Sequence, residues 1–387
     1  MLFFIRRLIL RGHSPTDVDI RSHAGIVSGA VGILLNVLLF LGKLIVALLS
    51  NSVAIIADAF NNLSDAGSSV VAMVGFKLSG KKPDPEHPFG HGRFEYVTGF
   101  IVSIAIIVMG FQLGVSSLKS IGTPSSVAFS VPMVAMLCAS IVVKLYMALY
   151  NTRLAKLFDS ATMKATATDS LSDVVATSAV LISLIISHYT ALNLDSYAGL
   201  LVSAFIIYSG ISAAKDTLEP LLGAPPDKEF VREVEEIVMQ HPPIVGMHDL
   251  VVHDYGPGRL MLSLHAEVPS DIDVFHAHCI IDDLENVLDE KLGCEAVIHF
   301  DPINTNDKEL DRLKAIVAEV ISGIDGNITM HDFRHVPGET HTNLLFDIVV
   351  PFSSKKCDDE LKREISRRVA ERLPNHLCVI KCDRGCV

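Results

Sequence analysis

Three aspartates, Asp65, Asp169 and Asp173, lie inside stretches that are otherwise apolar enough to cross a membrane. An ionised carboxylate at bilayer depth costs at least about 2.5 kcal/mol and faces a protein or water-filled interior, so such residues are treated first as functional. Asp169 and Asp173 are four residues apart and share one helix face, and Asn61 repeats that spacing before Asp65. If the two faces meet, four oxygen-bearing side chains surround one point.

These four side chains offer hard oxygen ligands and no nitrogen or sulfur, a set that suits Mn²⁺, Mg²⁺ or Ca²⁺. Their carboxylates also take up protons, so metal binding and proton release are coupled at one site, as a proton-driven cation antiporter requires. The alternative is structural, with the polar residues only bonding neighbouring helices. Asp58, earlier in the same stretch, either lines an access path or faces a polar partner.

A second group, Asp84, His87 and His91, lies in the Pro/Gly-rich segment KKPDPEHPFGHGRFEY. One aspartate and two histidines within eight residues are able to bind a transition metal. A short polar loop that carries two histidines for no metal is an equally good interpretation of the spacing.

A third group is rich in histidine and lies in the last part of the chain. Imidazoles with a carboxylate are typical ligands of divalent metals, and alternation along a strand puts His299 and Asp301 on one face. The group comprises His248, His265, His276, His278, His299 and Asp301.

Six apolar segments, each long enough for a membrane-spanning helix of about 20 residues, must position the aspartates. The excess of Lys and Arg in alternate connections predicts that both termini lie in the cytosol. Lys43 and Lys144 lie near segment ends, where we expect them to snorkel without a function. The segments are 25–49, 53–78, 96–121, 127–150, 161–188 and 194–222.

Charge divides the chain sharply. Residues 1–225 hold 15 Lys and Arg against 13 Asp and Glu, whereas residues 226–387 hold 17 against 31, which together give the net charge of −12. This predicts a membrane body and an acidic soluble part, and it argues against nucleic acid as a partner. The seven cysteines are odd in number and fit a reducing cytosol rather than a disulfide framework. Cys378, Cys382 and Cys386 recur every fourth residue, with a metal or thiol role left open.

The acidic part contains an internal duplication. Met247-His248-Asp249 corresponds to Met330-His331-Asp332, and Asp301 to Asp383, at a spacing of 82 to 83 residues. Each copy follows the order helix–strand–strand–helix–strand, which predicts two tandem α/β ferredoxin-like domains. Lys381 replaces the counterpart of His299, so the second copy is expected to be structural or dimer-building; His331, His335 and His341 leave a weaker metal hypothesis.

The expected organisation is therefore an α-helical membrane protein with six transmembrane helices, followed by two soluble domains. Its boundaries are 1–24 for an N-terminal cytosolic segment, 25–222 for the transmembrane domain, 226–304 for a cytosolic metal-binding domain and 307–387 for the second repeat.

Over residues 20–303 the chain resembles the cation diffusion facilitator family. The resemblance rests on six helices, the Asn61/Asp65 and Asp169/Asp173 pairs, the HPFGHG loop and a soluble domain ending in His-x-Asp-Pro. It implies a homodimeric, proton-coupled exporter of divalent metal whose transport site lies between the second and fifth helices. It also implies a loop site at Asp84, His87 and His91, and a binuclear cytosolic site at His248, His265, His278, His299 and Asp301.

Two departures from the zinc-transporting members concern the metal. Those members carry histidine at the position of Asp169 and usually aspartate at that of Asn61, so this chain resembles the manganese-transporting branch. A family salt bridge also links the loop after the second helix to the end of the sixth. Here Arg93 stands at the basic position but Gly223 at the acidic one, which leaves the bridge absent or formed with Glu219.

The sequence thus predicts a transporter rather than an enzyme, namely a homodimeric Mn²⁺/H⁺ antiporter of the inner membrane that exports metal from the cytosol. Metal in the cytosolic histidine site would regulate or stabilise the dimer. One alternative is an exporter of Zn²⁺ or Fe²⁺, with Cd²⁺ also open, in the same family. The other is a membrane-anchored metal sensor whose helices carry no flux.

Overall fold

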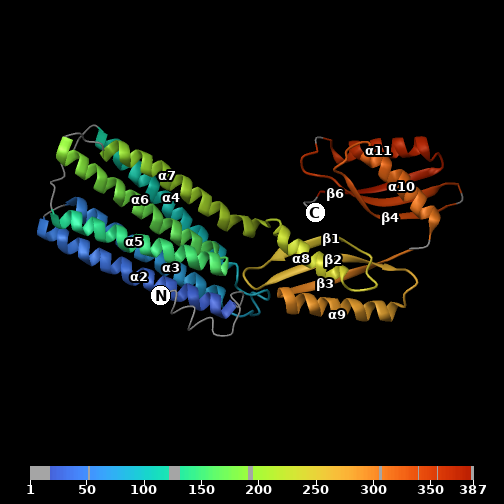
Figure 1. Ribbon diagram of the computed structural model, residues 1–387, viewed down its shortest axis with the longest axis horizontal. Coiled ribbons are helices and arrows are strands. Elements are labelled where there is room, and N and C mark those ends of the chain that lie inside the picture. The colour runs from blue at the N-terminus through green and yellow to red at the C-terminus, as the bar shows by residue number, and fades with distance from the viewer. Residues whose placement is uncertain are drawn as a thin grey trace. The chain divides into compact units, whose positions relative to one another are not determined.

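A computed structural model describes residues 18–50, 53–121, 131–190, 195–304, 307–338, 340–354 and 356–384. It divides into two compact units (Figure 1). The first holds the described residues up to Ala224 together with His253–Met261, and the second holds Pro225–Val252 and the residues from Leu262 onward. Arg6, Arg7, Arg11 and Cys386 lie outside the described residues.

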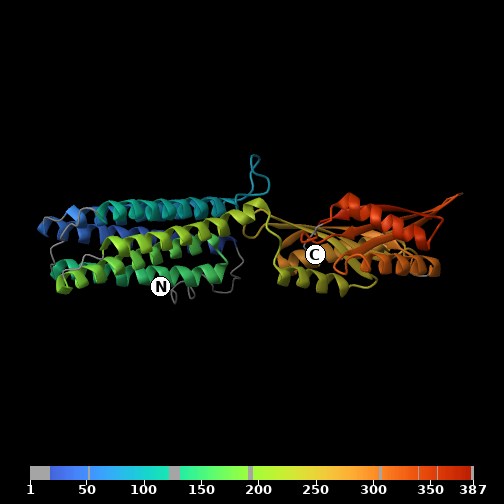
Figure 2. The same cartoon turned by 90° about the horizontal axis from the view of Figure 1, so that it is seen from above.

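Six long helices form the first unit and run side by side (Figures 1 and 2). Each predicted apolar segment corresponds to one of them, and the fourth extends eight residues beyond its predicted end at 150. The helices are α2 (Val18–Ser50), α3 (Val53–Ser79), α4 (Phe94–Ile121), α5 (Val131–Phe158), α6 (Ala161–Thr190) and α7 (Asp195–Leu222).

Five of these helices, all except α3, are long and apolar enough to cross a membrane over their described residues. The helix α3 is 27 residues long but carries Asp58, Asp65 and Lys77, which dilute its apolar character. The prediction that α3 also crosses the membrane therefore rests on its packing among the other helices, because α3 is less apolar than the five spans.

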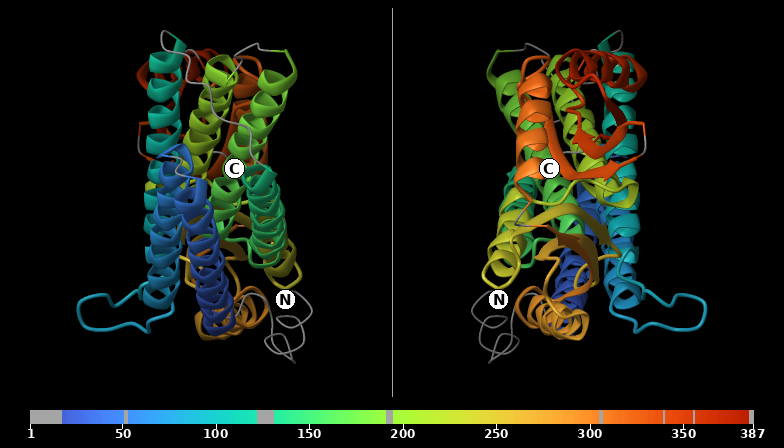
Figure 3. Two further views of the ribbon diagram at one scale, coloured as in Figure 1. Left: turned by 90° about the vertical axis from the view of Figure 1, so that its left-hand side faces the viewer. Right: turned by 90° about the vertical axis from the view of Figure 1, so that its right-hand side faces the viewer.

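Small residues allow the helices to approach one another closely, as is usual in membrane bundles. A methyl group on Gly25 of α2 would lie 2.1 Å from the ring of Phe76 on α3, so only glycine fits there. The helices pack as the pairs α2 with α3, α4 with α7, and α5 with α6. The connection between α3 and α4 leaves one end of the bundle as a long loop (Figure 3).

A buried ion pair joins three helices near that end. Arg21 of α2 donates to both carboxylate oxygens of Glu95 on α4, at 2.9 and 2.8 Å, and also to the backbone carbonyls of Phe158 and Asp159. Because Glu95 also accepts a hydrogen bond from Ser160, this charge pair is well satisfied and fixes the helix ends relative to one another.

The second unit contains two copies of the order helix–strand–strand–helix–strand. In each copy the three strands form one sheet in sequential order. The first copy comprises α8 (Lys228–Met239), β1 (Gly246–Asp254), β2 (Leu260–Pro269), α9 (Val274–Leu292) and β3 (Cys294–Ile303). The second comprises α10 (Lys308–Ser322), β4 (Thr329–Pro337), β5 (Thr342–Val349), α11 (Asp358–Arg372) and β6 (His376–Asp383).

The second copy shows how the pattern makes the layers. Strand β5 pairs antiparallel with β4 and parallel with β6, and its alternating apolar residues Leu344, Phe346 and Ile348 are fully buried. They form a core with apolar residues of α10 and α11, such as Val317 and Ile365. Each copy is thus an open-faced α/β sandwich. A ferredoxin-like domain has a further strand before its first helix, and the described residues of each copy lack it, so the ferredoxin-like prediction was correct only for the layers.

The Met-His-Asp sequence has the same unusual backbone in both copies. Asp249 has φ of 53° and Asp332 has φ of 50°, the left-handed region that aspartate tolerates better than most residues. In the second copy the pairing of β4 with β5 shifts register between His331 and Arg334, which marks a bulge. The shared conformation supports the predicted duplication and places the two histidines at equivalent points of their sheets.

Candidate functional site

The predicted transmembrane aspartates come together. Asp65 projects from α3, and Asp169 and Asp173 project from one face of α6. Each offers a carboxylate oxygen within 4.8 Å of the others, and all three residues are buried, at 2%, 7% and 7% exposure. Three carboxylates so close repel one another in a medium of low dielectric, so the cluster is stabilised by a nearby cation or by protonation.

Lys144 of α5 supplies that cation and is the main functional residue that the sequence analysis missed. Its ammonium donates to Asp65 Oδ2 at 2.7 Å and to Asp173 Oδ2 at 2.5 Å, and its side chain is 2% exposed. The expectation that Lys144 snorkels was wrong, because α5 continues to Phe158 and places this residue in the middle of the helix. The signal available in the sequence was a lysine inside a predicted apolar segment.

Lys43 of α2 is buried in the same way, so its predicted snorkelling was also wrong. Its ammonium lies 2.8 Å from Asp58 Oδ2 and 3.4 Å from the side-chain oxygen of Asn62. Of the two interpretations of Asp58, the structure therefore favours the one in which it faces a polar partner. Asp58 is not part of the carboxylate cluster.

Asn61 lies one turn before Asp65 on α3, and its side chain is exposed, whereas the adjacent Asn62 is buried. The described contacts do not join Asn61 to the carboxylate cluster. Its role as a fourth oxygen ligand stays a prediction.

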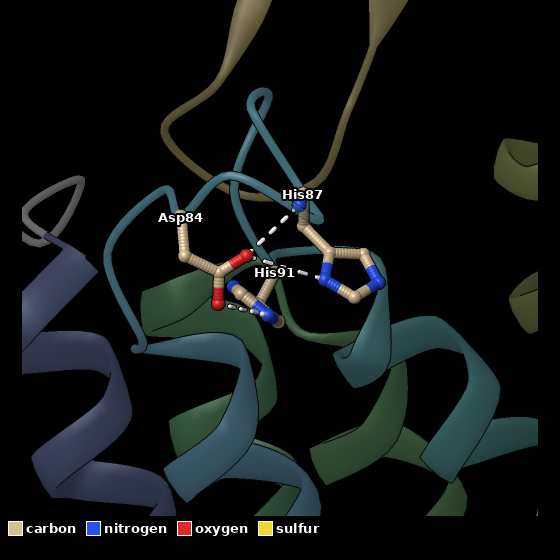
Figure 4. A group of neighbouring side chains, drawn as sticks. All are labelled: Asp84, His87 and His91. Atoms are coloured by element: carbon tan, nitrogen blue, oxygen red, sulfur yellow. Dashed lines mark hydrogen bonds and ion pairs between the residues drawn. The ribbon is translucent and has the colours of Figure 1, made fainter.

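The loop group is assembled as the spacing predicted (Figure 4). His87 Nδ1 and His91 Nε2 each lie 3.5 Å from an oxygen of Asp84, and the two rings are 4.6 Å apart. A hydrogen bond from Lys81 at 2.5 Å, aided by the backbone N–H of His87, lowers the pKa of Asp84 below its ordinary value. The carboxylate is thus ionised at neutral pH, although an ammonium already occupies one of its oxygens.

The described contacts of Arg93 agree with the interpretation in which the family salt bridge is absent, because Glu219 pairs with Lys215 instead. The guanidinium of Arg93 donates to the backbone carbonyl of Asp254 at 3.0 and 2.7 Å, and it lies over the ring of Tyr255. Tyr96 donates to the Asp254 carboxylate at 2.8 Å, and Phe89 stacks on Tyr255. In place of the family salt bridge to the sixth helix, these contacts join the loop to residues 253–261.

The cytosolic group converges on Asp301 of β3. Its carboxylate lies 3.3 Å from His248 Nε2, 2.8 Å from His265 Nδ1 and 3.3 Å from His299 Nε2. Neighbouring imidazole rings are 4.8 to 5.2 Å apart. Four of the five predicted ligands are therefore gathered on one sheet, in an arrangement that suits a divalent metal.

His278, the fifth predicted ligand, lies apart from this cluster. It sits on α9, is 65% exposed and lies 3.4 Å from Asp282 one turn later. His276 is exposed at the start of the same helix. Spacing in the sequence cannot place α9 residues on the sheet, because the helix covers its other side with Ala277 and Ile281 buried.

The thiols nearest the C-terminus are poorly suited to binding metal. Burial raises the pKa of Cys378 to about 11, and burial also raises the pKa of Cys382. Burial therefore disfavours the thiolate form that a metal binds. Cys386, the third of the series, lies outside the described residues.

Both the helical part and the first soluble copy of this chain are similar to known proteins. Residues 30–222 match the model of the cation efflux transmembrane domain, and residues 226–303 match that of the cytoplasmic domain of cation efflux proteins. An uncharacterized transporter of Methanocaldococcus jannaschii is 30% identical over 270 residues, which cover 70% of this chain and 95% of the relative. The cation-efflux pump FieF of Salmonella arizonae is 26% identical over 274 residues, covering 69% and 89% respectively.

A membrane bundle with buried carboxylates, joined to a soluble domain with a histidine cluster, defines a multi-pass membrane protein that transports cations. The chain belongs to the cation efflux family, whose members are transporters and not enzymes. Both family models end at or before residue 303, so the second α/β copy lies beyond the regions they match.

Proposed function

We propose that this protein exports Mn²⁺ from the cytosol in exchange for protons. The observation that carries the proposal is the buried cluster of Asp65, Asp169 and Asp173 between α3 and α6. Its three carboxylates, with Asn61 as a fourth proposed ligand, form an all-oxygen set that favours a hard divalent ion over Zn²⁺.

The formal charges of the cluster match a single divalent ion. Three ionised aspartates and one lysine ammonium leave a charge of −2, which one divalent cation neutralises. The ammonium of Lys144 occupies oxygens of Asp65 and Asp173 that the metal needs, so the incoming ion displaces it. We propose that Lys144 returns when the ion leaves and thereby keeps the empty site assembled.

Proton coupling follows from the same carboxylates. Each aspartate holds either a proton or a share of the metal, so metal release to the outside and proton uptake are alternatives at one set of oxygens. Neutralising the charge of −2 with two protons in place of one metal ion would make the exchange electrically balanced.

A second candidate is export of Zn²⁺ or Fe²⁺, and the cytosolic cluster favours it. His248, His265 and His299 around Asp301 form a mixed nitrogen and oxygen set that suits these ions, with Cd²⁺ as a further possibility. We assign this cluster a regulatory metal that need not be the transported one, since metal bound to the folded state stabilises the soluble domain by mass action.

Placement and assembly complete the proposal. We propose a homodimer in the inner membrane with both termini in the cytosol. Its support is the match to the cytoplasmic domain of the family and the Lys and Arg residues in or beside alternate connections, such as Lys81 and Lys156. The loop group of Asp84, His87 and His91 would then meet metal on the cytosolic side.

The test is flux through the purified full chain in proteoliposomes. Uptake of Mn²⁺, Zn²⁺, Fe²⁺ and Cd²⁺ is compared at one fixed pH gradient, and proton movement is followed with a pH-sensitive dye inside the vesicles. We expect Mn²⁺ uptake to be fastest and to collapse with the gradient. Faster Zn²⁺ or Fe²⁺ uptake would favour the second candidate, and absence of flux for all four ions would identify a membrane-anchored sensor.

A further inference from the structure

The second copy brings two potential ligands to the first. His331 of β4 and Asp383 of β6 lie beside Asp249 of β1, with one ligand atom from each residue within 4.8 Å of the others. His331 Nε2 is 3.7 Å from Asp249 Oδ1, and the His331 ring lies 5.0 Å from that of His248. The contact therefore joins the two sheets at their equivalent Met-His-Asp positions.

His331 has a largely buried imidazole, and its nitrogens lack a hydrogen-bond partner among the residues that the structure describes. Its side chain is 14% exposed, and neither ring nitrogen hydrogen-bonds to any residue that the structure describes. Buried polar groups nearly always have a partner, and 3.7 Å is too long for a hydrogen bond to Asp249. A tetrahedral zinc ion with bonds of about 2.0 to 2.2 Å holds its ligand atoms about 3.4 Å apart, which is close to the observed separation.

Through the duplication, two of these residues correspond to members of the cytosolic cluster in the first copy. His331 and Asp383 correspond to His248 and Asp301, which lie 3.3 Å apart in the first copy. In the second copy the rest of that arrangement has changed, because Asp347 and Lys381 face each other across β5 and β6. The retained histidine and aspartate turn instead to Asp249, whose left-handed backbone directs it out of the regular strand.

One cation already lies close to this group. The Lys381 ammonium is 3.1 Å from Asp383 Oδ2 and 3.3 Å from Asp347 Oδ2. Its side chain is 62% exposed, so it moves into water at little cost when a metal takes Asp383. Glu267, 3.6 Å from His248 Nδ1, adds a further negative charge nearby.

We propose that Asp249, His331 and Asp383 form a divalent metal site between the two copies. It adjoins the cluster around Asp301, because Asp249 also lies within ligand distance of His248 and His265. One imidazole and two carboxylates suit a first-row ion such as Zn²⁺, with water completing the coordination. The second copy thus contributes ligands and is held against the first by the metal. This goes beyond the proposed transport function and does not depend on which ion is exported.

The experiment counts Zn²⁺ bound to the purified full chain by equilibrium dialysis and mass spectrometry of the metal. We expect His331→Gln and Asp383→Asn each to lose one bound equivalent relative to the parent. His335→Gln is the matched control, because His335 lies on the same strand but bonds to Asp307, and it should bind as the parent does. Variant His299→Gln should lose a different equivalent, so its combination with His331→Gln should lose two.

Unchanged stoichiometry and affinity in His331→Gln would overturn the proposal. If that variant fails to fold, Asp249→Asn decides, because it keeps the side-chain shape at a position that is 30% exposed. Parent-like binding in folded Asp249→Asn would count equally against the site. Flux is measured in the same preparations to separate this site from the proposed function. Loss of one bound equivalent with normal flux supports the site. A transport defect with full Zn²⁺ binding would contradict the site and would concern only the transport function.

Discussion

The transmembrane and cytosolic clusters both gather carboxylates for a cation, but their surroundings are opposite. In the membrane bundle, Asp65 and its neighbours are almost fully buried and hold the ammonium of Lys144. On the soluble sheet, Asp301 is 21% exposed, and His299 beside it is 68% exposed. The described residues within ion-pairing distance of Asp301 are histidines, with no lysine or arginine among them.

The difference follows from the cost of charge in each place. Buried carboxylates without a partner are strongly unfavourable, so an empty transmembrane site needs a cation of its own. Imidazoles near water are stable in the neutral form, so they need no cation as a partner when the site holds no metal. We therefore expect the site with a tethered cation to release a bound ion more readily than the site without one.

The largest effect is expected from Lys144→Met. Removing the ammonium leaves Asp65 and Asp173 without their buried partner, which should lower the free energy of unfolding by about 3–5 kcal/mol in metal-free protein. Mn²⁺ should restore much of this loss, because the dication takes the place of the ammonium. Thermal unfolding in detergent, with and without Mn²⁺, measures both effects.

The control is Lys215→Met on α7, since Lys215 is 72% exposed and its ion pair is with Glu219 at the surface. It should unfold as the parent does. If metal-free Lys144→Met were equally stable, the tethered cation would have no part in holding the carboxylates together.

The next largest effect concerns metal choice. Asp169→His gives the transmembrane cluster an imidazole like those of the cytosolic cluster, so we expect the ratio of Mn²⁺ to Zn²⁺ flux to fall at least about tenfold. Competition between the two ions in proteoliposomes measures the ratio. An unchanged ratio in a folded variant would refute the argument from ligand hardness.

A smaller and separable effect is expected from Asp301→Asn. This carboxylate touches three imidazoles, so the variant should lose most of the stabilisation by Zn²⁺, which for a single site is about 2.7 kcal/mol at 100 times Kd. Mn²⁺ flux at saturation should stay within about twofold of the parent. Exposed Asp271→Asn serves as the control for both readouts. Parent-like stabilisation by Zn²⁺ would remove Asp301 from the site.

The smallest effect is predicted for the loop. The hydrogen bond from Lys81 lowers the pKa of Asp84, so this pair stabilises the fold above the unfolded pKa of about 3.9 and the stabilisation is lost as pH falls through the folded pKa. Lys81→Gln should therefore lower Tm slightly at pH 7, and the difference from the parent should shrink steadily as pH falls below about 3.9. A difference that grew on acidification would contradict the assignment.

The sequence was sufficient to predict the transmembrane carboxylates, because charge in an apolar stretch and spacing along a helix are both local properties. Lys144 escaped notice because the apolar stretch ends at residue 150, although α5 continues through Asn151 and Arg153 to Phe158. Helix length is determined by packing and hydrogen bonding as well as hydropathy, so a residue near the apparent end lies in fact at the centre.

In the soluble part too, some features could be predicted from local sequence and others depend on tertiary structure. The order of helices and strands and the duplication follow from local pattern, and period-two alternation puts His299 and Asp301 on one face. The grouping of His248 and His265 with them was implied only by the family resemblance. The contact of Asp249 with His331 does not, since it depends on how the two copies pack. The displacement of His278 from the cluster also depends on tertiary structure, because a histidine count cannot show which side of the sheet α9 covers.

The most direct test of the central claim is Mn²⁺ uptake by Asp173→Ala in proteoliposomes under a pH gradient. Binding of Zn²⁺ at the cytosolic cluster, measured in the same preparation, shows that the variant is folded. The account predicts uptake no faster than in protein-free vesicles, with cytosolic binding unchanged. Uptake equal to that of the parent would contradict the assignment of the transport site to the buried carboxylates of α3 and α6.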